Sequence, residues 1–184
     1  MNNEQKSVSL DEVIQLAVKT GVQAAFEYSN KEKSERLRKK YDRRLHNTKL
    51  LLKEYRTFKA HVKGAVYKSS DLRPIDILDE LDDDFITGQA YVESIKSSTE
   101  RTLVIVEHID TMLEVFREIC QRSKKLEQVR RCNIIFDMYI NGDVTNIEEV
   151  ARKYSIDIRT VYRDIDKVLP TLTVLFFGVD GLKT

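Results

Sequence analysis

The sequence predicts an all-α protein, and three observations support this prediction. The 184 residues include only six Gly and two Pro, so few positions interrupt a helix. Apolar residues recur at alternating spacings of three and four over long stretches, which is the period of an α-helix. Hydrophobic residues make up 41% of the chain and charged residues 33%, a balance that is typical of a folded protein rather than a disordered one.

The first helix is expected from Ser9 to about Ser29. Ser9 and Glu12 have the spacing of a capping box, in which two side chains satisfy free backbone N–H groups at a helix start. The helix then has a broad apolar side, formed by Val13, Ile14, Ala17, Val18, Val22, Ala24 and Ala25. We expect this side to be buried, either against the rest of the chain or against a second copy of it, as in a homodimer.

A second helical stretch is expected from residue 31 to about 67, either separate from the first helix or continuous with it. Its inward stripe consists of Leu37, Tyr41, Thr48, Leu51, Tyr55, Phe58, Val62 and Ala65, with Arg44 in the gap. Residues 31–68 hold 14 Lys and Arg against 4 Asp and Glu, a net charge of +10. This basic face is either a solvated surface or a contact for nucleic-acid phosphates or the acidic segment that follows. The candidate phosphate contacts are Arg36, Lys39, Lys40, Arg43 and Arg56.

An acidic linker is expected over residues 69–84, after the long basic region of residues 1–68. Residues 71–100 hold 9 acidic against 2 basic residues, a net charge of −7, and Pro74 disfavours helix just before it. Asp79 and Asp82 to Asp84 lack the alternating spacing of a calcium loop, so we expect no metal site. Whether this segment pairs with the basic helix, with a basic partner or only with water stays open.

A central amphipathic helix is expected over residues 85–125, where Ile105, Ile109, Met112, Phe116 and Ile119 are spaced four, three, four and three apart. Such a stripe predicts that this helix lies in the core or at a dimer interface.

Cys120 and Cys132 lie in apolar helical patterns, which indicates buried thiols and a reducing cytoplasm. The N-terminus lacks the pattern of a signal peptide. The longest apolar runs are too short to span a bilayer, so we expect a cytoplasmic protein with no membrane contact.

The last region, residues 126–184, is expected to form one module with an apolar C-terminal tail. A helix from Leu126 to Ile140 ends at Gly142. A second helix follows a Thr145–Glu148 capping box, and a third begins after the Asp157 cap and continues to Leu169. Ser155 and Ile156 form the turn between these two helices. The apolar string after Pro170 must pack against the module's own core or against a partner. If exposed, it would form a larger apolar patch than monomers normally leave uncovered.

The third of these helices has the residue types of a DNA-reading surface. Val161, Ile165, Val168 and Leu169 would be buried, and the opposite face carries Arg159, Thr160, Tyr162, Arg163 and Lys167. These donor-rich side chains can reach phosphates and base edges in double-stranded DNA. The fold class is therefore all-α, with long amphipathic N-terminal helices plus a C-terminal helix-turn-helix module.

The sequence has no pattern that is typical of an enzyme or a cofactor site. Its six glycines form no phosphate-binding loop, and the two cysteines lack metal or redox spacing. The histidines His46, His61 and His108 are scattered along the chain. We therefore expect neither catalysis nor a bound cofactor.

The string EVARKYSIDIRTVYRDIDKV resembles the helix-turn-helix of many bacterial regulators, in which a small residue and a turn precede a run like TVYRDI. With the basic N-terminal region, the acidic middle and the end LPTLTVLFFGVDGLKT, the layout is similar to phage- and prophage-encoded late-gene activators of the ArpU/RinA type. Their C-terminal module is similar to the promoter-reading module of sigma factors. The resemblance implies sequence-specific promoter binding and contact with RNA polymerase, and it supports the recognition face named above.

The leading hypothesis is a sequence-specific, sigma-like DNA-binding transcriptional regulator that acts on phage or prophage genes. One alternative is a DNA-packaging adaptor resembling a terminase small subunit, which would form rings of eight or more subunits. Another is a helical protein-interaction module that does not bind DNA. The target sequence and the sign of regulation stay open.

Overall fold

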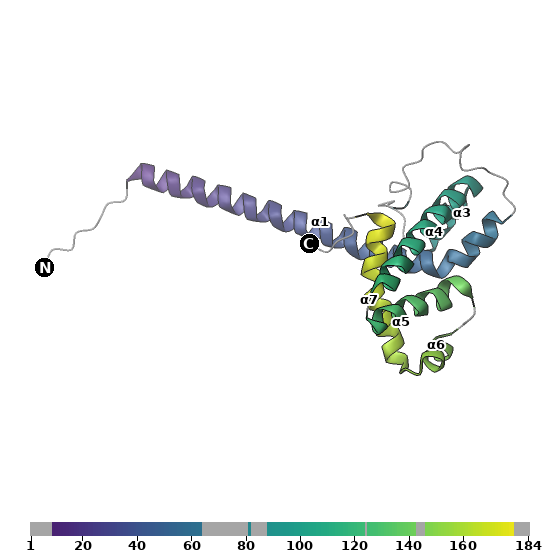
Figure 1. Cartoon of the computed structure of the whole chain (residues 1–184). Coiled ribbons are helices and arrows are strands. Elements are labelled where there is room, and N and C mark those ends of the chain that lie inside the picture. The colour runs from purple at the N-terminus through teal and green to yellow at the C-terminus, as the bar shows by residue number, and fades with distance from the viewer. Residues whose placement is uncertain (1–8, 64–80, 82–87, 124, 143–145, 179–184) are drawn as a thin grey trace. The chain divides into compact units, whose positions relative to one another are not determined.

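The computed structural model describes residues 9–63, 81, 88–123, 125–142 and 146–178, and every regular element in them is a helix (Figure 1). The prediction of an all-α protein is confirmed. The elements are α1 (Leu10–Val62), α3 (Gln89–Lys96), α4 (Thr99–Arg122), α5 (Leu126–Ile135), the π-helix η2 (Phe136–Asn141), α6 (Ile147–Tyr154) and α7 (Ile158–Phe177). None of the helices so described is both long and apolar enough to cross a bilayer.

The chain divides into two compact units, residues 1–40 and 41–184, and α1 has residues in both. The predicted capping box at the start of α1 is confirmed. The Ser9 backbone N–H donates to Glu12 Oε2 at 2.9 Å, and the Glu12 backbone N–H donates to Ser9 Oγ at 3.2 Å. The two predicted N-terminal helices are one continuous helix, because no helix-breaking residue separates them.

The second half of α1 contributes one wall of the core. Thr48, Leu51 and Phe58 are fully buried, as the spacing predicts, whereas Leu37, placed in the same stripe, is exposed. The helix ends at Val62 rather than near residue 67. Residues 64–80 and 82–87, which include Ala65 and almost all of the acidic linker, lie outside the described residues, so the predictions made for them stay predictions. Leu81 is buried, and its carbonyl accepts from the Tyr91 hydroxyl at 3.0 Å.

The region expected as one central helix, residues 85–125, contains two helices that meet at Ser97 and Ser98. Ser98 has an extended backbone and caps α4, because its Oγ accepts from the Arg101 backbone N–H at 3.4 Å. Thr102 Oγ1 donates across the break to the Ile95 carbonyl at 2.8 Å. Small hydroxyl side chains compete with the backbone for hydrogen bonds, which explains a break at this pair. Ile119, placed in the buried stripe, is exposed near the end of α4.

The C-terminal helices assemble around α7, which contacts α4, α5 and α6 (Figure 1). The prediction that α7 ends at Leu169 is wrong, since the helix continues through Pro170 to Phe177. Pro170 is exposed, and so is Asp166, the residue four positions earlier whose carbonyl loses its helical donor at a proline. The following turns are held by burial of Leu172, Phe176 and Phe177, which confirms that the described part of the apolar string after Pro170 is docked. Residues 179–184 lie outside the described residues.

Side-chain hydrogen bonds join the C-terminal half of α7 to α1 and α4. The Thr48 and Thr173 hydroxyls of α1 and α7 lie 2.9 Å apart, and both are fully buried. His108 Nε2 of α4 lies 3.0 Å from the Phe176 carbonyl, so this histidine meets the C-terminal end of α7. One end of α7 is therefore fixed by the core of the second unit.

Candidate nucleic-acid interface

The helices α6 and α7 are joined by a turn of three residues, 155–157. Asn146 caps α6, because its side chain accepts from the Glu149 backbone N–H at 2.9 Å. The predicted cap, Thr145, lies outside the described residues, and the helix begins one residue later than a Thr145 cap requires. Asn146, which was not predicted as the cap, is also of a residue type that caps helices well.

The turn after α6 has the hydrogen bonds of a Schellman motif. The Ser155 backbone N–H donates to the Arg152 carbonyl at 3.2 Å, and that of Ile156 donates to the Ala151 carbonyl at 3.0 Å. Ser155 adopts a left-handed backbone with φ of 52°, which is rare for a residue other than glycine. The predicted turn at Ser155 and Ile156 is confirmed, and Ile156 packs against the core.

The start and the buried side of α7 also follow the sequence. Asp157 is the predicted cap, and its Oδ1 accepts from the Arg159 backbone N–H at 2.7 Å. The four residues expected to face inward are buried: Val161, Ile165, Val168 and Leu169. This burial fixes which side of α7 faces water.

The predicted DNA-reading residues lie on that opposite side. Arg159, Tyr162, Arg163 and Lys167 are exposed, and Thr160 is half-buried at the edge. Arg159, Arg163 and Lys167 follow one another at intervals of four residues, so they form a stripe with steps of about 6 Å along the axis. Within the part of the chain that the structure describes, none of these three side chains has an ion-pair partner, which leaves their charges available to an anion.

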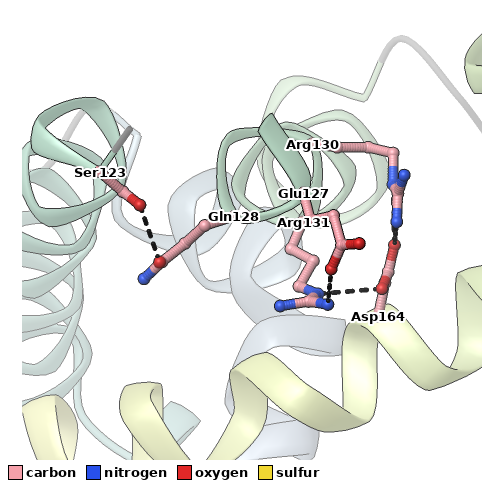
Figure 2. A network of polar contacts seen from close by, with 6 residues as sticks. All are labelled: Ser123, Glu127, Gln128, Arg130, Arg131 and Asp164. Carbon is pink, nitrogen blue, oxygen red and sulfur yellow. Dashed lines mark hydrogen bonds and ion pairs between the residues drawn. The ribbon is translucent and has the colours of Figure 1, made fainter. Parts of the chain in front are cut away.

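A buried carboxylate, Asp164, anchors the same turn of α7 to α5 (Figure 2). Its side chain is 1% exposed and lies between two arginines of α5. Arg130 Nε and Nη2 donate to Oδ2 at 2.9 and 2.7 Å, and Arg131 Nε donates to Oδ1 at 2.9 Å. Arg131 Nη2 also donates to Glu127 Oε2 at 2.8 Å. Because Asp164 directly follows Arg163, this network sets the rotation of α7 about its own axis.

A second buried carboxylate, Asp137 of η2, holds α6 in a similar way. The Tyr154 hydroxyl donates to Asp137 Oδ2 at 2.5 Å, and Lys153 Nζ lies 2.7 Å from the same oxygen. Burial and this hydrogen bond raise the pKa of the Tyr154 hydroxyl well above its usual value. Both helices of the pair are thus tied to the α5–η2 segment by an acid inside the core.

The candidate phosphate contacts of α1 are divided between the two units. Arg36, Lys39 and Lys40 belong to the first unit, and Arg43 and Arg56 belong to the second. Arg36 is paired with Glu32 at 3.4 Å. Arg56 Nη2 donates to the Met138 carbonyl at 3.3 Å, and its guanidinium lies where a side chain on Gly142 would be. Arg56 therefore supports the end of η2 in addition to presenting a charge.

Asp137 and Asp164 were not identified from the sequence, although Asp164 leaves a signal there. Asp164 occupies a position that the spacing of Val161, Ile165 and Val168 assigns to the buried face. An acid at such a position requires a buried partner. The adjacent pair Arg130 and Arg131 is the complementary signal, but the spacing alone does not show which residues meet.

Comparisons with protein-family models, with curated proteins and with solved structures find no match to this chain. In the described ranges, no group of three or more His, Cys, Asp and Glu side chains is placed to hold a metal ion. The surface of α7 offers exposed hydrogen-bond donors and positive charge.

Proposed function

We propose that this protein is a sequence-specific DNA-binding protein in which α6 and α7 act as a helix-turn-helix. In this proposal the N-terminal half of α7 lies in the major groove. The observation that carries the proposal is the stripe of Arg159, Arg163 and Lys167, exposed and without ion-pair partners in the described chain, on a helix whose other side is buried.

The dimensions of the stripe fit a DNA groove. Its three cations extend over about 12 Å of helix, which matches three to four base pairs of duplex. Arginine pairs with guanine through two hydrogen bonds, and lysine neutralises phosphates as a point charge. Thr160 and Tyr162 add hydroxyl groups beside the stripe, so that the surface combines base-reading and phosphate-binding side chains.

A rigid support favours this function over a merely solvated helix face. Asp164 fixes α7 at the residue after Arg163, and the core holds the far end of the helix at Phe176. Base reading requires side chains held within fractions of an ångström, and sites on rigid helices meet this requirement better than loops do.

Within this proposal, a sigma-like transcriptional regulator of phage or prophage genes is the role that the sequence resemblance favours. Such a regulator would contact RNA polymerase as well as promoter DNA. In such a regulator, the acidic segment of residues 69–84 and the N-terminal helical region would be the parts of the chain that contact the polymerase.

The test is a selection from random DNA duplexes at about 150 mM salt, an ionic strength at which non-specific binding is weak. We expect one defined site to be enriched. Replacing Arg163 by Ala should then weaken binding to that site by roughly 5- to 150-fold, which corresponds to about 1–3 kcal/mol. Arg122→Ala is the matched control, because Arg122 is an exposed arginine at the end of α4 whose partner among the described residues is Glu118 of the same helix.

The specificity ratio separates two roles for Arg163. If it reads a base, the ratio of specific to non-specific affinity should fall. If it binds a phosphate, that ratio should stay unchanged, while the slope of log affinity against log salt concentration should fall in magnitude by about one. Absence of any enriched site, together with no duplex binding at low salt, would refute the proposed function.

A further inference from the structure

The N-terminal part of α1 carries a wide apolar surface that the described residues leave exposed. Successive residues of a helix are separated by about 100° around its axis, so apolar residues at spacings of three and four fall on one half of the circumference. We call this surface the α1 apolar face, and it consists of Leu10, Val13, Ile14, Ala17, Val18, Gly21, Val22, Ala24, Ala25 and Tyr28. All ten residues are exposed.

The size of this face is that of a protein interface. Its six large residues are 51–76% exposed, which leaves on the order of 700 Å² accessible. Each partner in a specific complex contributes about 800 Å². Single proteins rarely leave contiguous apolar patches of more than a few hundred Å² uncovered. The face is therefore expected to have a partner.

We propose that the partner is a second copy of this chain, packed antiparallel against the same face. Charges at the two ends of the segment carry this choice. Its first turn is acidic, with Asp11 and Glu12, whereas residues 31–40 hold six Lys and Arg against two Glu. Antiparallel packing brings the acidic turn of each copy beside Lys31 and Lys33 of the other. Parallel packing would place the two basic segments together.

The middle of the face suits close contact between two helices. Ala17, Gly21 and Ala24 lie along its centre, between larger side chains at both ends. A Cβ placed on Gly21 would meet no atom within 4 Å, so the space over this residue is open. A two-fold axis near this centre makes the interface self-complementary, which is the common arrangement of homodimers.

The polar side of the same segment disfavours a membrane surface as the partner. Helices that lie on anionic membranes carry Lys and Arg opposite their apolar face. Between residues 10 and 28, this segment has Lys19 but also Asp11, Glu12 and Glu27. Its charges therefore complement the basic end of another copy better than a negatively charged bilayer.

The test is the mass of the full chain in solution, measured by sedimentation equilibrium over a range of concentrations without DNA. We expect twice the 21.5 kDa of one chain. Ile14→Glu should raise the dimer dissociation constant on the order of tenfold or more, because it places a charge inside the interface. Leu16→Glu is the matched control: Leu16 is 66% exposed, Ile14 is 51% exposed, and two residues on a helix point about 200° apart.

A monomer at micromolar concentration would overturn this proposal, and so would equal dissociation constants for the Ile14→Glu and Leu16→Glu variants. Rings of eight or more subunits would also overturn it and would favour the packaging adaptor. None of these results bears on DNA binding by α7, which is measured separately with the duplex selection.

Charge reversal tests the orientation. In an antiparallel pair, the double change Lys31→Glu and Lys33→Glu should weaken the dimer by roughly 2- to 5-fold, since exposed ion pairs contribute little each. Adding Asp11→Lys and Glu12→Lys should restore it. In a parallel pair the first change would tighten the dimer by relieving repulsion, and that result would refute the antiparallel arrangement.

Discussion

Replacing Asp164 by Asn probes the network that holds α7 against α5. The two side chains have nearly the same shape, so the change removes the negative charge without opening a cavity. Arg130 and Arg131 would then face a neutral amide that competes as a donor. Three hydrogen bonds from guanidinium groups to a carboxylate would be lost or weakened. We therefore expect α7 to be less firmly held and the folded state to be less stable.

The magnitude follows from the burial of the three side chains. Removing one partner of a fully buried ion pair costs about 3–5 kcal/mol. Here the carboxylate is 1% exposed, but Arg130 and Arg131 are 28% and 19% exposed. Both arginines can regain some hydration once their partner is neutral, which reduces the cost. We expect Asp164→Asn to lower the free energy of unfolding by about 2–3 kcal/mol.

Urea unfolding followed by circular dichroism measures this loss at one fixed protein concentration. With a slope of about 2 kcal/mol per molar urea, the midpoint should fall by about 1–1.5 M. Asp166→Asn is the control, because Asp166 pairs with Lys49 at 3.2 Å while the two side chains are 65% and 53% exposed. This surface pair should contribute about 0–1 kcal/mol. Equal midpoints for the two variants would refute the anchoring role of Asp164.

Two further predictions concern the thiols and a buried tyrosine. Burial raises the pKa of the Cys132 thiol to about 12 and also raises that of the free Cys120 thiol, so both should react with a disulfide reagent at pH 8 only as fast as the protein opens. Reaction of both thiols within seconds in the native protein, as fast as in denaturant, would contradict this burial. Tyr154 has a raised pKa in the folded state, whereas an unfolded tyrosine ionises near pH 10. Its contribution to stability is therefore complete below about pH 10 and is lost as the pH rises further, so urea midpoints should fall from pH 9 to 11 and Tyr154→Phe should show a smaller fall.

Hydrophobic spacing and capping residues predicted the local features of α1 and α7. The inward residues of α7 and the caps at Ser9 and Asp157 lie where the pattern placed them, because each depends on neighbours within one turn of helix. The exposed stripe on α7 could be predicted for the same reason. Once the buried side is known, the opposite side follows from the helical period.

The features that the sequence did not predict depend on contacts between distant residues. Ser97 and Ser98 interrupt a clean helical pattern, because Thr102 and Ile95 from the two sides satisfy the broken backbone. Pro170 lies inside a helix because the residues beyond it are buried against α1 and α4. Asp137 likewise finds its partners in another helix, α6. Local propensity is weaker than these tertiary contacts, so spacing alone gives the wrong boundary.

The continuity of α7 through Pro170 bears on how its exposed face would work. The half after the proline is held by Thr48 and His108, and the half before it is held by the two arginines around Asp164. Any rotation of the half before the proline must therefore break a buried charged network or bend the helix at Pro170. Both cost more than thermal energy, so the stripe is presented in one fixed orientation. Preorganisation of this kind lowers the entropy lost on binding, as the proposed DNA-reading role of this surface would require.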